Sequence, residues 1–226
     1  MKKFDAVIFD LDGTLLYTLD DVTDSMNYML EKHHFALRSR DEIKSFVGEG
    51  AGRLMERAIP GGRSNPEFEK CLADYFVHYF ANMQNKTYPF EGIPETVRKL
   101  YEGGFKMAVV SNKIDNATKE LTQKYFGDYI KVAIGQSADI ASKPAPDTVF
   151  QALEELGVSP DKALYVGDME IDIETARNSG TVSVAVTWGY RAREFLEENG
   201  AEYVIDRPQE LLDIVSFEKK GGGLNV

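Results

Sequence analysis

Carboxylate side chains follow two apolar runs of this sequence, and their spacing suits them to hold a cation. Asp10 and Asp12 come directly after the run at residues 6–9. Side chains two residues apart on an extended chain point the same way, so both carboxylates can face one site. Two close carboxylates are costly without a cation, so this segment predicts a hard metal ion such as Mg²⁺. A pair of solvated turn aspartates before Gly13 is the alternative interpretation.

A second pair of carboxylates repeats this arrangement later in the chain. Asp168 comes just after the apolar run at residues 163–166, where a strand would end. Asp172 lies four residues further on, at the start of an expected helix. The positive end of a helix dipole favours a carboxylate there, so capping alone is the competing explanation for Asp172.

Two other polar segments have donors that a phosphate group needs. Ser111, Asn112 and Lys113 follow the apolar run at residues 107–110, and a hydroxyl with free backbone amides can hold phosphate oxygens. Lys143 precedes a proline, which restricts it to an extended conformation and holds its ammonium group on a stiff loop. Taken singly, a polar capping loop and a solvated lysine also explain these two segments.

Apolar runs of four or five residues predict the strands that carry these groups. Such continuous runs are typical of strands buried on both faces of a parallel sheet. Helical segments lie between them, so we expect an α/β fold with a doubly wound, Rossmann-like parallel sheet. Ligands of such sheets bind at the carboxyl ends of the strands. The runs are residues 6–9, 107–110, 163–166 and 182–186.

The stretch from residue 17 to residue 88 differs from the rest because it contains no convincing strand. An amphipathic pattern at residues 20–33, a capping box at residues 39–42 and a long segment at residues 65–85 each predict a helix. The last segment has aromatic residues spaced like one helix face, and we expect them to pack inside this insert: Tyr75, Phe76, Tyr79 and Phe80. The expected organisation is an α/β core of residues 1–16 and 89–220, a helical insert of residues 17–88 and a flexible tail of residues 221–226.

The composition limits the classes of protein and partner. Of 226 residues, 26 are Lys or Arg and 37 are Asp or Glu, so the net charge is −11. These fractions are typical of a globular protein, and the lack of a dense basic run argues against nucleic-acid binding. Cys71 is the only cysteine, so no intramolecular disulfide can form, and we expect a small buried side chain. With neither a signal-peptide pattern nor an apolar run near 20 residues, we expect a cytoplasmic protein that binds no membrane.

The four polar segments, in this order, resemble the four motifs of the haloacid dehalogenase superfamily of phosphohydrolases, and the insert resembles its first type of helical cap. The resemblance covers nearly the whole chain. Within the superfamily, the chain looks like a phosphoglycolate phosphatase at residues 47–58, 111–113, 143–147 and 187–191. Two departures leave the substrate open. Tyr17-Thr18 stands where Asp-Ser is usual, and Met169 stands where Ser or Thr is usual.

This resemblance implies roles for the core residues. Asp10 would be the nucleophile, and Asp12 would protonate the leaving oxygen and then activate water. Mg²⁺ would be held by Asp10, the backbone carbonyl of Asp12 and Asp168. Asp172 would contact the ion through a water molecule or would support the ligands without binding the ion. The remaining groups would stabilise charge on the phosphoryl oxygens: Ser111, Asn112 and Lys143.

The resemblance also implies a substrate class. It points to a small phosphorylated metabolite, with 2-phosphoglycolate favoured, acted on by a monomer or homodimer. Arg53 would contact a substrate carboxylate, because a guanidinium pairs two oxygens at once, but a solvated helix face explains Arg53 equally well. A phosphosugar mutase of the β-phosphoglucomutase kind and a non-catalytic phosphate-binding protein of the same fold remain as alternatives. A haloacid dehalogenase is disfavoured, because Asp12 supplies an acid that carbon–halogen cleavage does not need.

Overall fold

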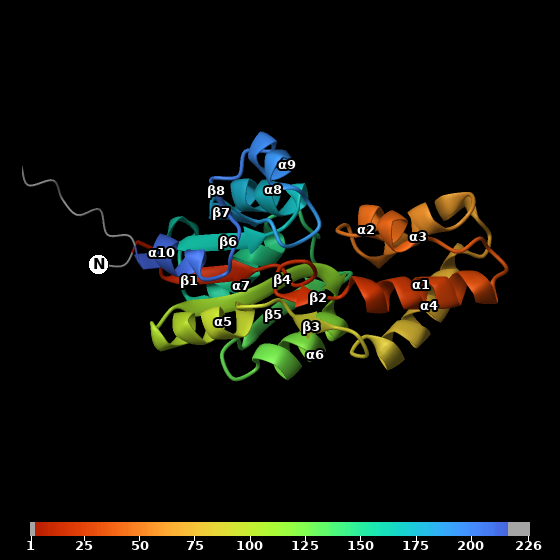
Figure 1. Ribbon diagram of the computed structural model, residues 1–226, viewed down its shortest axis with the longest axis horizontal. Helices are drawn as coiled ribbons and strands as arrows, with labels where there is room; N and C mark the ends of the chain where they lie inside the picture. The colour runs from red at the N-terminus through yellow and green to blue at the C-terminus, as the bar shows by residue number, and fades with distance from the viewer. Residues whose placement is uncertain (1–2, 217–226) are drawn as a thin grey trace, which may run out of the picture.

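A six-stranded parallel sheet forms the larger part of the molecule. The computed structural model describes residues 3–216, so the tail expected at residues 221–226 lies outside the described part. The strand order is β5-β4-β1-β6-β7-β8 (Figure 1). In chain order the strands are β1 (Ala6–Phe9), β4 (Lys106–Ile114), β5 (Val132–Gln136), β6 (Ala163–Gly167), β7 (Val182–Val186) and β8 (Tyr203–Ile205). The predicted α/β class and all four predicted strands are confirmed, whereas β5 and β8 carried no signal strong enough to predict.

The sequence of the central strand, β1, reflects its burial in the middle of the sheet. β1 pairs in parallel with β4 on one side and with β6 on the other. All its side chains are buried, because helices cover both faces of the sheet. Burial on both faces requires a continuous apolar run rather than an alternating one. The carboxyl ends of β1, β4 and β6 therefore lie beside one another at one edge.

Helices of the core follow the strands. They are α5 (Ile93–Glu102), α6 (Asp115–Phe126), α7 (Asp147–Leu156), α8 (Glu170–Ser179), α9 (Arg193–Glu198) and α10 (Glu210–Ser216), with a short 3₁₀ turn, η2 (Pro160–Lys162). α8 begins directly after β6, so the end of β6 and the first turn of α8 share one corner of the sheet. Both Asp168 and Asp172 lie at this corner.

The helices of the insert lie together beyond the carboxyl edge of the sheet (Figure 1). They are α1 (Leu19–Lys32), α2 (Arg40–Phe46), α3 (Ala51–Ala58), the 3₁₀ turn η1 (Gly62–Ser64) and α4 (Phe68–Asn82). The capping box predicted at the start of α2 is present, since Ser39 and Glu42 exchange side-chain and backbone hydrogen bonds. Cys71 is fully buried, as expected.

Two short strands at the ends of the insert were not predicted. β2 (Leu16–Tyr17) pairs antiparallel with β3 (Tyr88–Pro89). Strands of two residues are too short to show any periodicity. Their pairing holds the start and the end of the insert side by side, with the rings of Tyr17 and Tyr88 stacked 5.1 Å apart.

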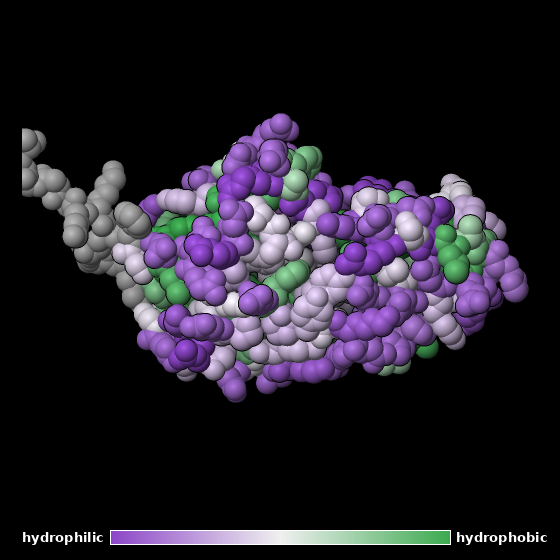
Figure 2. Space-filling model, in the orientation of Figure 1, coloured by the Kyte–Doolittle hydropathy of each residue, from purple (hydrophilic) through white to green (hydrophobic). Residues whose placement is uncertain are grey.

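The surface has no extended apolar region on the face drawn in Figure 2, where polar residues predominate and apolar ones are scattered. Within residues 3–216, no helix has the length and apolar character needed to cross a membrane.

Candidate active site

Asp10 marks the end of β1 and the centre of the site. Its backbone N–H donates to the Val166 carbonyl at 2.8 Å, which holds the end of β1 against β6. The chain then turns at Gly13, whose φ is +84°. A Cβ at Gly13 would lie 2.4 Å from an Asp168 oxygen. Only glycine therefore lets the first motif pass this close to the carboxylate of β6.

Asp168 is fully buried directly beneath this turn. Thr14 Oγ1 donates to one carboxylate oxygen at 3.1 Å, and the Tyr190 backbone N–H donates to the other at 2.7 Å. Gly189 approaches as closely as Gly13, since a Cβ there would lie 2.3 Å from Asp168 Cβ. The Asp168 carboxylate is thus approached closely by backbone on both sides, at two positions where a side chain would collide with it.

Asp172 and Lys143 form the back of the site. Asp172 Oδ2 accepts the backbone N–H groups of Asp168 and Met169 at 3.1 and 3.0 Å. Its other oxygen accepts from Lys143 Nζ at 2.7 Å. Lys143 Nζ also lies 3.0 Å from Asp10 Oδ1. Asp172 therefore acts as a helix cap and as the anchor of Lys143 at once, and both its oxygens are engaged.

The charges at this corner fit a divalent cation. Asp10, Asp168 and Asp172 can each place an oxygen within 4.8 Å of the others. When all four groups are ionised, Lys143 balances one of the three carboxylates and two negative charges remain. Asp10 Oδ1 is buried and accepts no hydrogen bond, although the Lys143 ammonium lies near it. An all-oxygen donor set is what a hard cation such as Mg²⁺ prefers.

Burial governs the ionisation of these carboxylates. It raises the pKa of Asp10 from 3.8 to about 6, against the opposing effect of the Lys143 ammonium. Burial, and then the charges of Asp172 and Asp10, raise the pKa of Asp168 well above its usual value. Burial alone would lower the pKa of Lys143, but Asp10 and Asp172 outweigh it and raise that pKa. Lys143 is therefore a permanent cation behind the nucleophile position.

The second motif brings Ser111 and Asn112 to the same edge, at the end of β4. Both are buried. Asn112 Nδ2 donates to the carbonyls of Gly48 and Lys143, each at 3.1 Å. The amide side chain thus ties the core to the insert and to the Lys143 loop, which leaves the Ser111 hydroxyl and backbone N–H groups as the donors for a phosphate.

Lys113 is a site residue whose contact the sequence did not reveal. Its Nζ donates to both carboxylate oxygens of Asp12, each at 2.9 Å. The Lys113 side chain is 6% exposed and that of Asp12 is 25% exposed. The two residues lie 101 positions apart, so no spacing in the sequence indicates this pair.

A cavity opens between the core and the insert directly above Asp10 and Asp12. Its walls are mostly apolar and aromatic. It is lined by Asp10, Asp12, Thr18, Val22, Val47, Gly48, Gly50, Ala51, Leu54, Tyr75, Phe76, Tyr79, Ser111, Asn112, Lys113, Ile114, Met169 and Tyr190. The aromatic residues of α4 were expected only to pack inside the insert. Tyr75 and Tyr79 do pack, with parallel rings 5.5 Å apart, but together with Phe76 they also form a wall of this cavity.

Arg53 lies outside this cavity, contrary to the contact considered for it. Its side chain is 52% exposed, and its guanidinium pairs with Glu56 at 2.9 Å and with Glu49 at 3.9 Å. The interpretation as a solvated residue of a helix face, which the sequence left open, describes its place in α3. The cause is helical periodicity: Ala51 and Leu54, three residues apart on one face of α3, line the cavity, and Arg53 lies on another face.

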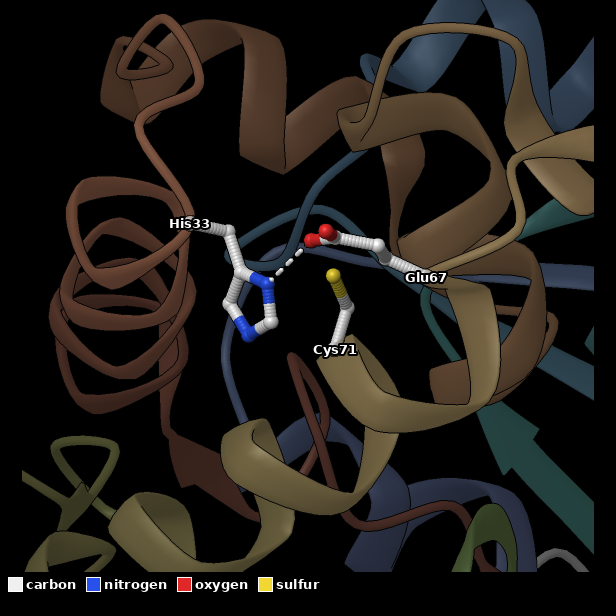
Figure 3. Close-up of side chains that lie close together, drawn as sticks. All are labelled: His33, Glu67 and Cys71. Atoms are coloured by element: carbon white, nitrogen blue, oxygen red, sulfur yellow. Dashed lines mark hydrogen bonds and ion pairs between the residues drawn. The ribbon is translucent and has the colours of Figure 1, made fainter.

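A second group of possible metal ligands lies inside the insert, away from the cavity (Figure 3). His33, Glu67 and Cys71 can place ligand atoms within 4.8 Å of one another. However, His33 Nδ1 already lies 2.7 Å from Glu67, and His33 Nε2 lies 2.8 Å from Asp74. The imidazole therefore joins the end of α1 to two carboxylates of the α4 segment.

Comparison with known proteins identifies this arrangement. A family model for haloacid dehalogenase-like hydrolases matches residues 7–186. The chain belongs to this family. A phosphoglycolate phosphatase from Aquifex aeolicus is 30% identical over 212 residues, which cover 93% of this chain and 96% of that protein. An N-acetylmuramic acid 6-phosphate phosphatase from Pseudomonas aeruginosa is 29% identical over 215 residues, which cover 94% of this chain and 95% of that protein.

A solved structure agrees with these relatives. It is a Lactobacillus delbrueckii protein predicted to be a phosphoglycolate phosphatase, with a TM-score of 0.89 and 34% identity over 96% of this chain and all of the other. The predicted resemblance to the haloacid dehalogenase superfamily, and within it to phosphoglycolate phosphatases, is confirmed. The relatives carry names for different substrates, so similarity alone does not fix what this chain acts on.

Proposed function

We propose that this chain is a Mg²⁺-dependent phosphatase that hydrolyses a small phosphomonoester, with 2-phosphoglycolate as the favoured substrate, through an aspartyl-phosphate on Asp10. The observation that carries the proposal is the buried Asp10 carboxylate at the end of β1, with one oxygen free of hydrogen bonds and Lys143 and Asp168 beside it. The names of the relatives support the substrate class.

The first chemical step forms a covalent bond to the enzyme. An oxygen of Asp10 attacks phosphorus while the bond from phosphorus to the ester oxygen breaks. Asp12, which lines the cavity, delivers a proton to the departing oxygen. Lys143 and the Ser111 hydroxyl stabilise the negative charge that spreads over the phosphoryl oxygens.

The second step releases phosphate. A water molecule attacks the phosphorus of the aspartyl-phosphate, and Asp12 accepts the proton that this water loses, which restores Asp10 as a free carboxylate. Asp10, the Asp12 backbone carbonyl and Asp168 would hold Mg²⁺, which when bound neutralises charge on the transferred group. Asp172 would support this set without binding the ion, because its oxygens are occupied by Lys143 and two backbone N–H groups.

Phosphate release from a panel of phosphomonoesters tests the proposal directly. The panel contains 2-phosphoglycolate, sugar phosphates and p-nitrophenyl phosphate, each with Mg²⁺ or with EDTA. We expect Mg²⁺-dependent release and an acid-stable trapped phosphoenzyme. Conversion of a sugar phosphate to its isomer with little free phosphate would instead identify a mutase. No turnover of any ester would leave a non-catalytic phosphate-binding protein.

A further inference from the structure

Among the residues that the structure describes, the cavity between the core and the insert has one cationic side chain in its lining. Lys113 is the sole lysine or arginine in its lining, whereas Asp10 and Asp12 contribute two carboxylates. Lys143 lies behind Asp10 with a side chain that is 1% exposed, and it does not line the cavity. Arg53 lies outside the cavity and pairs with Glu49 and Glu56. Within the described residues, Lys113 is therefore the one side-chain cation that this lining offers to a negative charge on the leaving group.

The position of Lys113 places its ammonium group at the junction of core and insert. The residue belongs to the core strand β4, and its Nζ lies 4.9 Å from the centre of the Tyr79 ring on α4. Two of its N–H bonds are directed at the two oxygens of Asp12. An ammonium group has three N–H donors, so one remains for a further acceptor in the cavity.

We infer that Lys113 is the residue that selects this substrate, because its ammonium group binds the carboxylate that 2-phosphoglycolate carries close to the ester oxygen. The inference rests on the proposed phosphatase function and deepens it. A carboxylate enclosed by apolar and aromatic walls is costly unless it is paired with a cation. Because Lys113 also holds Asp12, the carboxylate that it binds lies close to the acid that protonates the leaving oxygen.

Two substrates that differ only in the carboxylate provide the test. In ethyl phosphate, a methyl group replaces the carboxylate of 2-phosphoglycolate. We expect the wild-type enzyme to favour 2-phosphoglycolate in kcat/KM. Lys113→Met removes the cation, and a lost charge-assisted hydrogen bond should lower this preference by about 10- to 100-fold. Both substrates are expected to slow, because Asp12 loses its partner as well, so the measured quantity is the ratio of the two kcat/KM values.

Two further variants serve as controls, one for misfolding of Lys113→Met and one for the loss of a cation elsewhere in the protein. Lys113→Gln keeps a donor for Asp12 while removing the charge, and it should show the same loss of preference even if Lys113→Met does not fold. Arg53→Met removes a cation of the insert that lies outside the cavity, and it should leave the ratio within about two-fold, as is usual for exposed substitutions.

The outcomes separate this inference from the proposed function. A wild-type enzyme that treats both esters alike would overturn the inference, and so would Lys113 variants that keep the preference for 2-phosphoglycolate. In either case Mg²⁺-dependent turnover of ethyl phosphate leaves the phosphatase function standing. Absence of Mg²⁺-dependent turnover with every ester means instead that the proposed function itself is wrong.

Discussion

Replacing Asp10 with asparagine should stabilise the metal-free protein while abolishing turnover. The change removes the nucleophile, so no aspartyl-phosphate forms. It also removes a buried charge whose pKa is raised from 3.8 to about 6. Ionised Asp10 thus costs the folded state up to about 3 kcal/mol at pH 7, at 1.36 kcal/mol for each unit of pKa. Lys143 keeps Asp172 as its partner, so the substitution leaves no unpaired ammonium group.

The dependence on pH follows from the direction of this shift. Between about pH 4 and pH 6 the folded wild type holds a proton on Asp10 that the unfolded chain has already lost. The contribution of Asp10 to the stability of the metal-free wild type therefore becomes more favourable as the pH falls from 7 to 4, and Asp10→Asn lacks this contribution. The advantage of the variant should be largest at pH 7 and disappear near pH 4.

Urea unfolding in EDTA at pH 7 and at pH 4 measures this difference. Asp5→Asn, at the exposed start of the same segment, is the matched control and should change the free energy of unfolding by less than about 0.5 kcal/mol. An Asp10→Asn protein that is equally or less stable than wild type at pH 7 would refute the electrostatic reasoning. Substantial turnover by the variant would refute the covalent mechanism.

Two further predictions concern the metal ion and the acid. EDTA should remove activity and Mg²⁺ should restore it; in Asp168→Asn the Mg²⁺ concentration for half-maximal rate should rise at least about 10-fold, and an unchanged value would show that Asp168 is no ligand. Asp12→Asn should slow phosphoenzyme formation about 10²–10⁴-fold for an alkyl ester such as 2-phosphoglycolate, but far less for p-nitrophenyl phosphate, whose leaving group needs no proton. Single-turnover measurements with both esters test this, and equal slowing would exclude Asp12 as the acid.

The sequence by itself determined the class of fold and indicated the candidate residues for the chemistry. Buried parallel strands need largely apolar runs, so four such runs were visible, and the polar residues directly after three of them indicated the edge that carries the candidate site. The signals lay in neighbouring residues: an apolar run precedes Asp10 and another precedes Asp168, and a proline follows Lys143. These are local properties, which depend on a few consecutive residues.

Only the tertiary structure decided which of these side chains meet. The order of the strands places β1 between β4 and β6, and this order cannot be read from the strands one by one. The pairing of Lys113 with Asp12 depends on β1 and β4 lying side by side in the sheet. The aromatic wall from α4 depends on how the insert lies over the sheet edge. Arg53 shows the same limit, because the rotation of a short helix turns its neighbour Leu54 into the cavity and leaves the guanidinium outside. A pattern along the chain fixes the period of a helix, whereas packing against the rest of the fold fixes which face points to the substrate.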